Sequence, residues 1–132
     1  VLKSDWRRWV VSVSDRLRRF LVGQPAALHV YLRGPVTSDS AIGRMEEMLS
    51  VLEQATGDSA SAQRAYAAIH TYTVGFAALE ASRSSWQRRR DGEEDTIARE
   101  LGSYTSSRQF SEGLGYILDG IEARALRRVR TR

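Results

Sequence analysis

The segment Phe110–Arg124, FSEGLGYILDGIEAR, constrains the fold of this chain more than any other stretch. At 100° per residue, its apolar side chains fall within a stripe about 100° wide, the width of a packed helix face. Glycines also lie in this helix, although each interior glycine costs about 1 kcal/mol relative to alanine. Gly113 and Gly120 lie along one border of the stripe, which favours the close approach of a second helix over tolerance of weak helix formers. The stripe consists of Phe110, Leu114, Ile117, Leu118, Ile121 and Ala125, and the glycines are Gly113, Gly115 and Gly120.

The composition is that of one globular domain. The chain has 132 residues, of which 42% are hydrophobic and 27% charged; this is enough apolar surface for a core and too much for a disordered segment. It has no cysteine, which excludes a disulfide scaffold and a cysteine-based metal site or nucleophile. No apolar run approaches the ~20 residues of a membrane span, so no membrane partner is expected. The first residue is not methionine, and we expect the chain to be part of a longer protein.

Helical periodicity runs through nearly the whole sequence, whereas no segment alternates as a strand does. Prolines and glycines mark the breaks, and serines are placed to cap the starts; these are Pro25, Pro35, Gly23, Gly57, Ser4, Ser59, Ser61, Ser106 and Ser107. The charged segment Gln87–Asp95 is predicted to be a solvated loop. The predicted helices span Asp5–Val22, Pro25–Leu32, Asp39–Thr56, Ala60–Ser84, Asp95–Gly102 and Arg108–Val129.

The first predicted helix has an apolar face and a basic face. Its arginines do not alternate with exposed aromatic residues as in proteins that bind single strands, and no compact helix pair with a basic second helix is present. Direct binding of nucleic acid by this chain is therefore not expected. The apolar face carries Trp6, Trp9, Val10, Val13, Leu17, Phe20 and Leu21, and the side predicted to be solvated carries Arg7, Arg8, Arg18 and Arg19.

The fourth predicted helix is apolar around a wide arc, so it must be covered from two sides. The second cover is either the rest of its own domain or a second chain, and the periodicity favours neither. Glu80, on the bulky side, is expected to form an ion pair or to extend towards solvent. The face around Gly75 carries Ala65, Ala68, Tyr72 and Leu79, and the adjoining bulky face carries Tyr66, Ile69, Thr73, Phe76 and Glu80.

The sequence carries no recognisable catalytic or metal motif. Phosphate-loop, dinucleotide-binding, zinc-protease and nucleophile-elbow patterns are absent, and neither His29 nor His70 has the Glu-x-x-His spacing of a helical di-metal site. Aromatic, methionine and hydroxyl side chains on facing stripes form either a packed core or a ligand pocket. A large apolar cavity near His70 or Thr73 would favour the pocket. The residues concerned are Trp6, Trp9, Met45, Met48, Ile69, Tyr72, Thr73 and Phe76.

Four segments, in this order, resemble the C-terminal regulatory domain of the TetR-type (tetracycline repressor-like) transcriptional regulators. The third is similar to the Y-x-x-G pattern of the family's central helix, and the fourth to its closing F-x-x-G-L helix. Together they extend over nearly the whole chain. The segments are Trp6-Arg7 with Gly23-Gln24-Pro25; Gly34-Pro35 with Ile42–Leu52; Tyr72-Thr73-Val74-Gly75-Phe76 with Glu80; and Phe110-Ser111-Glu112-Gly113-Leu114 with Ile117-Leu118-Asp119-Gly120-Ile121-Glu122.

The resemblance implies an all-α orthogonal helical bundle over residues 1–132, the effector-binding and dimerisation domain of a bacterial, cytoplasmic regulator. Its two long late helices would form a four-helix bundle with those of a second copy. A small apolar or aromatic effector would release the regulator from operator DNA, which is bound only through an N-terminal helix-turn-helix domain absent from this chain. The alternative is a helical protein–protein interaction module without a ligand; a small helical enzyme is disfavoured because no acid–base or nucleophile constellation appears.

The resemblance also implies which residues form each site. No histidine constellation matches the drug–magnesium site of tetracycline repressor, so no metal, cofactor or catalytic residue is expected. The implied dimer interface contains Tyr72, Gly75, Leu79, Phe110, Leu114, Ile117 and Ile121. The implied pocket contains Trp9, Val13, Met45, Leu49, Leu52, Ile69, Thr73 and Phe76, with His29 and His70 as candidate polar contacts.

Overall fold

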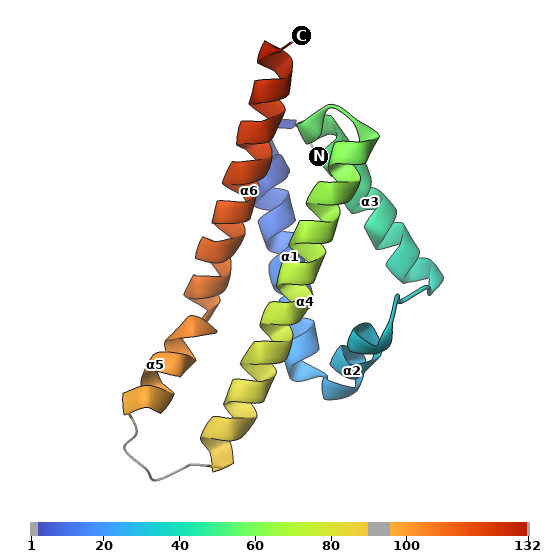
Figure 1. The fold of residues 1–132 in the computed structure, drawn as a ribbon. Coiled ribbons are helices and arrows are strands. Elements are labelled where there is room, and N and C mark those ends of the chain that lie inside the picture. The colour runs from blue at the N-terminus through green and yellow to red at the C-terminus, as the bar shows by residue number, and fades with distance from the viewer. Residues whose placement is uncertain (1–2, 90–95, 132) are drawn as a thin grey trace.

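The computed structural model describes residues 3–89 and 96–131, which form helices joined by short connections (Figure 1). The predicted all-α class is confirmed, and the described residues contain no strand. A 3-10 turn, η1 (Lys3–Asp5), precedes the α-helices. These are α1 (Trp6–Gly23), α2 (Pro25–Arg33), α3 (Asp39–Thr56), α4 (Ser59–Arg89), α5 (Thr96–Tyr104) and α6 (Ser107–Arg130).

The predicted helix bounds agree closely with the structure except at the end of α4. This helix continues to Arg89 instead of ending at Ser84, so the first part of the predicted loop Gln87–Asp95 is helical. Glutamine and arginine are good helix formers, and the charged stretch contains no helix breaker before Gly92. Residues 90–95 of the predicted loop lie outside the described part of the chain.

Local signals fix several helix ends. The Gln109 amide donates to the Ser106 hydroxyl at 3.1 Å at the start of α6, as predicted. Gly57, with φ of +91°, ends α3 in the left-handed region that favours glycine. The prediction was wrong at two starts. Asp58 accepts from the Ser61 amide at 2.7 Å at the start of α4, and the N-cap position of α1 is Asp5, without a side-chain cap.

Helix α4 is the central element of the fold. It contacts each of the other five α-helices of the described chain. In Figure 1, α6 runs along one side of α4 and α3 lies on the other, and the N- and C-termini lie at the same end of the bundle. Other helices cover most of α4, which explains the wide apolar arc of its sequence. One face, around Gly75 and Leu79, remains exposed.

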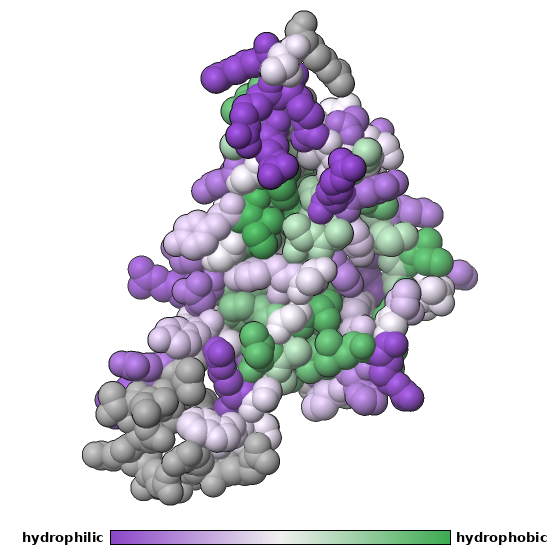
Figure 2. Space-filling model, viewed as in Figure 1, coloured by the Kyte–Doolittle hydropathy of each residue, from purple (hydrophilic) through white to green (hydrophobic). Residues whose placement is uncertain are grey.

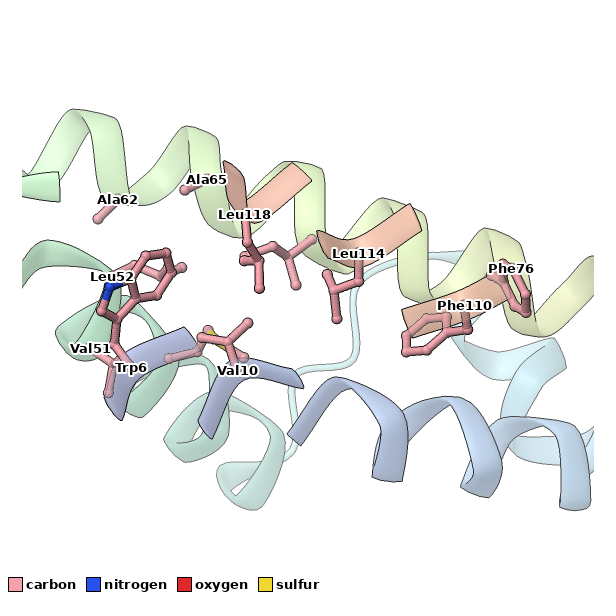
Figure 3. Packing of buried hydrophobic residues seen from close by; sticks show 12 residues of the cluster. Trp6, Val10, Val51, Leu52, Ala62, Ala65, Phe76, Phe110, Leu114 and Leu118 are labelled. Carbon is pink, nitrogen blue, oxygen red and sulfur yellow. The ribbon is translucent and has the colours of Figure 1, made fainter. Parts of the chain in front are cut away.

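The main core joins α1, α3, α4 and α6 (Figure 3). Trp6 and Val10 of α1 and Leu52 of α3 pack beneath Leu114 and Leu118 of α6. A smaller cluster holds α2 against α1 and α4 through Leu21, Leu28, Val74 and Ala77. The apolar stripe predicted at Phe110–Arg124 therefore packs against other helices of the same chain, since Phe110, Leu114 and Leu118 all lie in the main core.

The buried face of α1 differs from the predicted one. Its buried residues follow a spacing of about four: Trp6, Val10, Ser14, Arg18 and Leu21. Arg18, predicted to be solvated, is only 3% exposed, whereas Phe20, predicted to be buried, is exposed. The helical periodicity of α1 predicted Arg18 to be in solvent because charged residues are usually exposed. Periodicity carries no information about an acidic partner on another helix.

That partner is Glu80 of α4. The Arg18 Nη1 donates to Glu80 Oε2 at 2.8 Å, and its Nη2 donates to Asp15 Oδ1 at 2.8 Å and to the Ser107 hydroxyl at 3.1 Å. Burial lowers the pKa of Arg18, but hydrogen bonds to Asp15 and Glu80 outweigh it and leave the pKa above its ordinary value. The guanidinium also lies 5.1 Å from the ring centre of Phe110. This buried cation therefore ties α1, α4 and α6 together.

Gly113 shows the close approach that the glycine pattern predicts, but the neighbour belongs to the same chain. A Cβ added at Gly113 would collide with the hydroxyl of Tyr72 on α4. That hydroxyl donates to the carbonyl oxygen of Phe110 at 3.0 Å. A Cβ at Gly75 or Gly120, by contrast, would meet no atom within 4 Å. A side chain at position 113 would therefore displace the Tyr72 ring, whereas the packing of the chain itself places no such demand at Gly75 or Gly120. The atoms close to Gly113 belong to a side chain and not to the backbone of a second helix.

Candidate functional site

A cavity lies among α1, α2, α3 and α4, beside His70 and Thr73, but it is small, whereas the sequence criterion for a ligand pocket was a large cavity at this place. Its volume is about 70 Å³. The lining is mainly aliphatic and aromatic, with a few polar groups, which is typical of a ligand site. The lining residues are Val13, Ser14, Leu17, Tyr31, Ala41, Arg44, Met45, Met48, Tyr66, Ile69, His70 and Thr73.

Two open grooves adjoin this cavity. One, about 450 Å³, shares Val13, Leu17, Tyr31 and Arg44 with it. The other, about 370 Å³, lies towards the α2–α3 connection and shares Tyr31, Met45, Tyr66 and His70. Ligand pockets usually measure about 300–1,000 Å³, so the inner cavity alone is too small for most effectors. Methionine side chains adapt easily, and Met45 lines both the cavity and the smaller groove, so we expect its rotamer to decide how far the two spaces connect.

An aromatic stack forms one wall. The imidazole of His70 stacks on the ring of Tyr66, with ring centres 5.4 Å apart and planes 16° apart, and lies 6.1 Å from the ring of Tyr31. Burial lowers the pKa of His70, so the imidazole is neutral at pH 7. Burial also raises the pKa of Tyr66, which remains a phenol. The wall therefore consists of flat, uncharged rings that carry hydrogen-bonding groups.

The polar groups of the cavity differ in whether they have partners. The Thr73 hydroxyl donates to the Ile69 carbonyl at 2.8 Å within α4, so its one proton is already used. Ser14 is 3% exposed, and its hydroxyl makes no hydrogen bond to any described residue. Arg44, at the rim, is exposed and forms no ion pair within the described ranges. The Ser14 hydroxyl is not among the fully enclosed unpartnered atoms of the described chain, so water or a ligand in the cavity can reach it.

The structure brings five predicted pocket residues to the cavity wall: Val13, Met45, Ile69, His70 and Thr73. Trp9 lines the larger adjoining groove instead. Sequence reasoning missed Ser14, Leu17, Tyr31, Ala41, Arg44 and Tyr66 as wall residues. The spacing of Tyr66 and His70, four positions apart on α4, was the available signal for an aromatic pair.

The other predicted pocket residues lie elsewhere, and these assignments are corrected. Leu52 and Phe76 are buried in the main core, where α6 covers them. Leu49 is half-buried and is not part of the cavity wall. His29 is exposed on α2 and does not line the cavity. On α3 the cavity residues lie towards the start of the helix and the core residues towards its end. On α4 the cavity residues lie between the core residues Ala62 and Phe76, so periodicity cannot separate the two sets.

The predicted interface residues divide between surface and core. Leu79, 53% exposed, and Gly75 lie on the surface of α4, and Ile117 and Ile121 line a groove of about 370 Å³ between α4 and α6. Figure 2 shows apolar surface gathered along this α4–α6 side of the molecule. Small and aromatic residues line the same groove, and so do three arginines; these are Ala65, Ala68, Tyr116 and Gly120, with Arg64, Arg124 and Arg128.

The remaining predicted interface residues are turned inwards. Phe110 and Leu114 are 0% exposed, so they are not available to touch a second chain, and their assignment is corrected. Tyr72 is half-buried, with its ring stacked on Phe110 at 5.3 Å between centres. The physical reason is that the apolar stripe of α6 is narrow and its centre packs against α1 and α4. Only the border of the stripe is left for contact with a second chain.

Residues 2–125 match the sequence profile of one protein family, described as "Tetracyclin repressor-like, C-terminal domain". The chain belongs to this family. The match extends over all the helices that build the cavity and over most of α6. Neither the curated proteins nor the solved structures include a significant match to this tetracyclin repressor-like domain.

Two kinds of feature, a metal-binding cluster and a membrane-spanning helix, are not found in the described residues of the tetracyclin repressor-like domain. Among residues 3–89 and 96–131, no three His, Asp or Glu side chains gather as a metal-binding group. No helix in the described part is both long and apolar enough to cross a membrane.

His70 should make the stability of the domain sensitive to pH. Its pKa in the folded chain is lowered from 6.5 by burial, so below pH 6.5 the unfolded chain binds a proton that the folded chain resists. The free energy of unfolding should therefore fall as the pH drops from 7 through 6.5. Urea titrations at several pH values give the slope of the free energy of unfolding against pH. This slope should be smaller in His70→Phe, which keeps the ring stack. His29→Gln, at an exposed position, should keep the slope; equal slopes in all three proteins would contradict the assignment.

Proposed function

We propose that this chain is the effector-binding and dimerisation domain of a TetR-like transcriptional regulator. A small apolar or aromatic effector binds in the cavity among α1–α4, and two copies associate through α4 and α6. The operator is bound by an N-terminal helix-turn-helix domain that precedes these residues in the intact protein. The observation that carries the proposal is that α4 presents cavity residues on one face and an uncovered apolar surface on another.

The shared helix explains how an effector would act. Ile69, His70 and Thr73 line the cavity, whereas Gly75 and Leu79 follow within two turns on the uncovered face. A ligand that fits only one placement of α4 shifts the population of dimer geometries, because it binds one state more tightly than the other. The effect on DNA affinity cannot exceed the difference between those two binding free energies.

The α4–α6 surface suits a helical partner. Gly75 and Gly120 have open space above them, so another helix backbone can approach closely there. Leu79 and Tyr116 are large apolar side chains that are more than half exposed, and such side chains become anchors when an interface buries them. A second copy of the chain supplies a surface of the same chemistry, as a two-fold interface requires.

The small volume of the inner cavity supports an alternative function, a helical protein–protein interaction module without a ligand. At about 70 Å³, the space is filled mostly by side chains, as expected for a helical interaction module without a ligand. The unpartnered Ser14 hydroxyl and the two adjoining grooves favour the effector-binding function instead.

Leu79→Arg should convert the dimer into a monomer. The substitution places a charge on the proposed α4–α6 interface, while Leu79 is 53% exposed in the single chain and lies outside its core. We expect the dissociation constant measured by sedimentation to rise by at least about 100-fold, the effect of losing roughly 3 kcal/mol at an anchor residue.

The matched control is Leu32→Arg. Leu32 is 57% exposed on α2, away from the α4–α6 face, so this variant should dimerise as the parent chain does. An unchanged dimer in Leu79→Arg, with circular dichroism showing both variants folded, would refute dimerisation through α4.

A further inference from the structure

The charge around the cavity is one-sided. Arg44 is the one charged side chain among the described residues that line the inner cavity. His70 beside it is neutral because burial lowers its pKa. Glu47, one turn further along α3, lines the outer groove but not the inner space, and it forms no ion pair with Arg44 within the described chain. Arg44 therefore has no ion-pair partner among the described residues, and Arg16 and Glu47 line the outer groove beside it.

Arg44 is also close to the aromatic wall. Its positive charge acts on the phenol of Tyr66 strongly enough to offset part of the rise in pKa that burial causes. Both residues contact the inner cavity. The arrangement thus places a planar cation next to the stacked rings of Tyr66 and His70. A guanidinium is the side chain best suited to hold a carboxylate with two parallel hydrogen bonds.

The cavity wall offers one hydroxyl group, that of Ser14, without a hydrogen-bond partner among the described residues. Ser14 is 3% exposed, lines the cavity and makes no hydrogen bond to the described residues. Its neighbours on the wall are apolar: Val13, Leu17, Met48 and Ile69. A ligand in the cavity therefore meets mainly apolar side chains, with Ser14 as a buried hydrogen-bonding group.

The size of the spaces limits the shape of the ligand. An apolar cavity of about 150 Å³ is enough to hold benzene, and the inner space here is about 70 Å³. A flat ring system needs more room than this, so it requires Met45 or Met48 in the wall to change rotamer, with the edge of the ring in the groove that Arg44 lines. Such a ligand gains stacking from the rings of the wall.

We infer that the effector of this domain is a planar aromatic carboxylate, with its rings against Tyr66 and His70 and its anionic group on Arg44. The inference rests on the proposed function, because it names the ligand class for the same cavity. Neutral aromatic ligands would leave Arg44 unused, and saturated acids would lose the stacking.

Three probes of nearly equal size separate these contributions. Calorimetric titration of the 132-residue chain with 2-naphthoate, 2-naphthamide and decahydro-2-naphthoate compares an aromatic acid, a neutral aromatic amide and a saturated acid. We expect the aromatic acid to bind at least about tenfold more tightly than either of the others, since one charge-assisted hydrogen bond or one aromatic contact contributes on the order of 1.4 kcal/mol.

Variants assign the preference to individual residues. Arg44→Gln should remove the preference for the acid over the amide while leaving the affinity for the amide unchanged. Glu47→Gln should strengthen binding of the acid, because it removes the carboxylate that lines the outer groove together with Arg44. Arg33→Gln, which removes the same charge from an exposed site on α2, should bind all three probes as the parent chain does.

The outcomes distinguish the inference from the proposed function. If the acid and amide bind equally, or if Arg44→Gln keeps the preference for the acid, the inference is refuted while effector binding in the cavity stands. If none of the three probes binds but neutral apolar compounds raise the melting temperature, the inference is again refuted alone. If no small molecule stabilises the chain, both the inference and the effector-binding function fail, and dimerisation is judged separately by Leu79→Arg.

Discussion

Replacement of Glu80 by alanine should lower the free energy of unfolding by about 3 kcal/mol. Arg18 is 3% exposed, and Glu80 supplies its partner on α4, with Nη1 to Oε2 at 2.8 Å. Removing one member of a buried pair leaves a charge in a poorly solvated site, which typically costs about 3–5 kcal/mol. Asp15 still holds Arg18 from the preceding turn of α1, so the lower end of that range applies. Urea denaturation at a fixed protein concentration measures the change.

Two controls identify the cause. Arg18→Met combined with Glu80→Leu removes both charges and should restore most of the lost stability, because a buried ion pair is often replaced by apolar residues at little cost. Asp119→Ala breaks the exposed contact between Arg7 and Asp119 and should cost less than about 1 kcal/mol. If Glu80→Ala costs no more than Asp119→Ala, Arg18 finds enough water in the folded chain, and the account of a buried cation is wrong.

Phe110→Ala should cost about 3–5 kcal/mol, a range typical of deleting a buried aromatic ring. Phe110 has no exposed surface. Its ring packs on Tyr72 and Phe76, with centres 5.3 and 5.1 Å away, and lies beneath the guanidinium of Arg18. The substitution therefore opens a cavity at the point where α1, α4 and α6 meet, and these helices cannot close it without breaking other contacts.

The matched control for this prediction is Phe20→Ala. Phe20 is also a phenylalanine, but it is more than half exposed on α1, so its removal should change the free energy of unfolding by roughly 0.5 kcal/mol or less. Thermal denaturation of both variants at one protein concentration gives the comparison. A similar loss in both would mean that α6 does not pack on the core through Phe110.

The helices of this fold could be predicted from sequence because their signals are local. Apolar spacing, Ser106 as a cap and Gly57 as a stop each act within a few residues, and each is used as predicted. The end of α4 was missed because a run of charge was taken as a loop, although its first residues are good helix formers.

Which face of a helix turns inwards could not be predicted, because that depends on residues distant in the sequence. Arg18 is buried only because Glu80, on another helix, compensates its charge. Phe110 and Leu114 were placed in the interface with a second chain, yet α1 and α4 of the same chain cover them first. Periodicity finds an apolar stripe and does not say which neighbour occupies it.

The residues of the candidate cavity were predictable only where they belong to an apolar stripe of a long helix. Val13, Met45, Ile69, His70 and Thr73 were found from facing apolar stripes. Tyr31 and Arg44 were missed, since one lies on the short helix α2 and the other at an exposed position of α3. Only the packing of α2 against α4 brings Tyr31 to the imidazole of His70.

The central position of α4 has a consequence for how the domain unfolds. Every other α-helix in the described chain contacts α4, and the larger and the smaller core cluster both include its residues. No group of helices can separate from the rest as an independent unit without exposing part of α4 to water. Loss of α4 is loss of both cores at once, so the bundle should melt as a single cooperative transition.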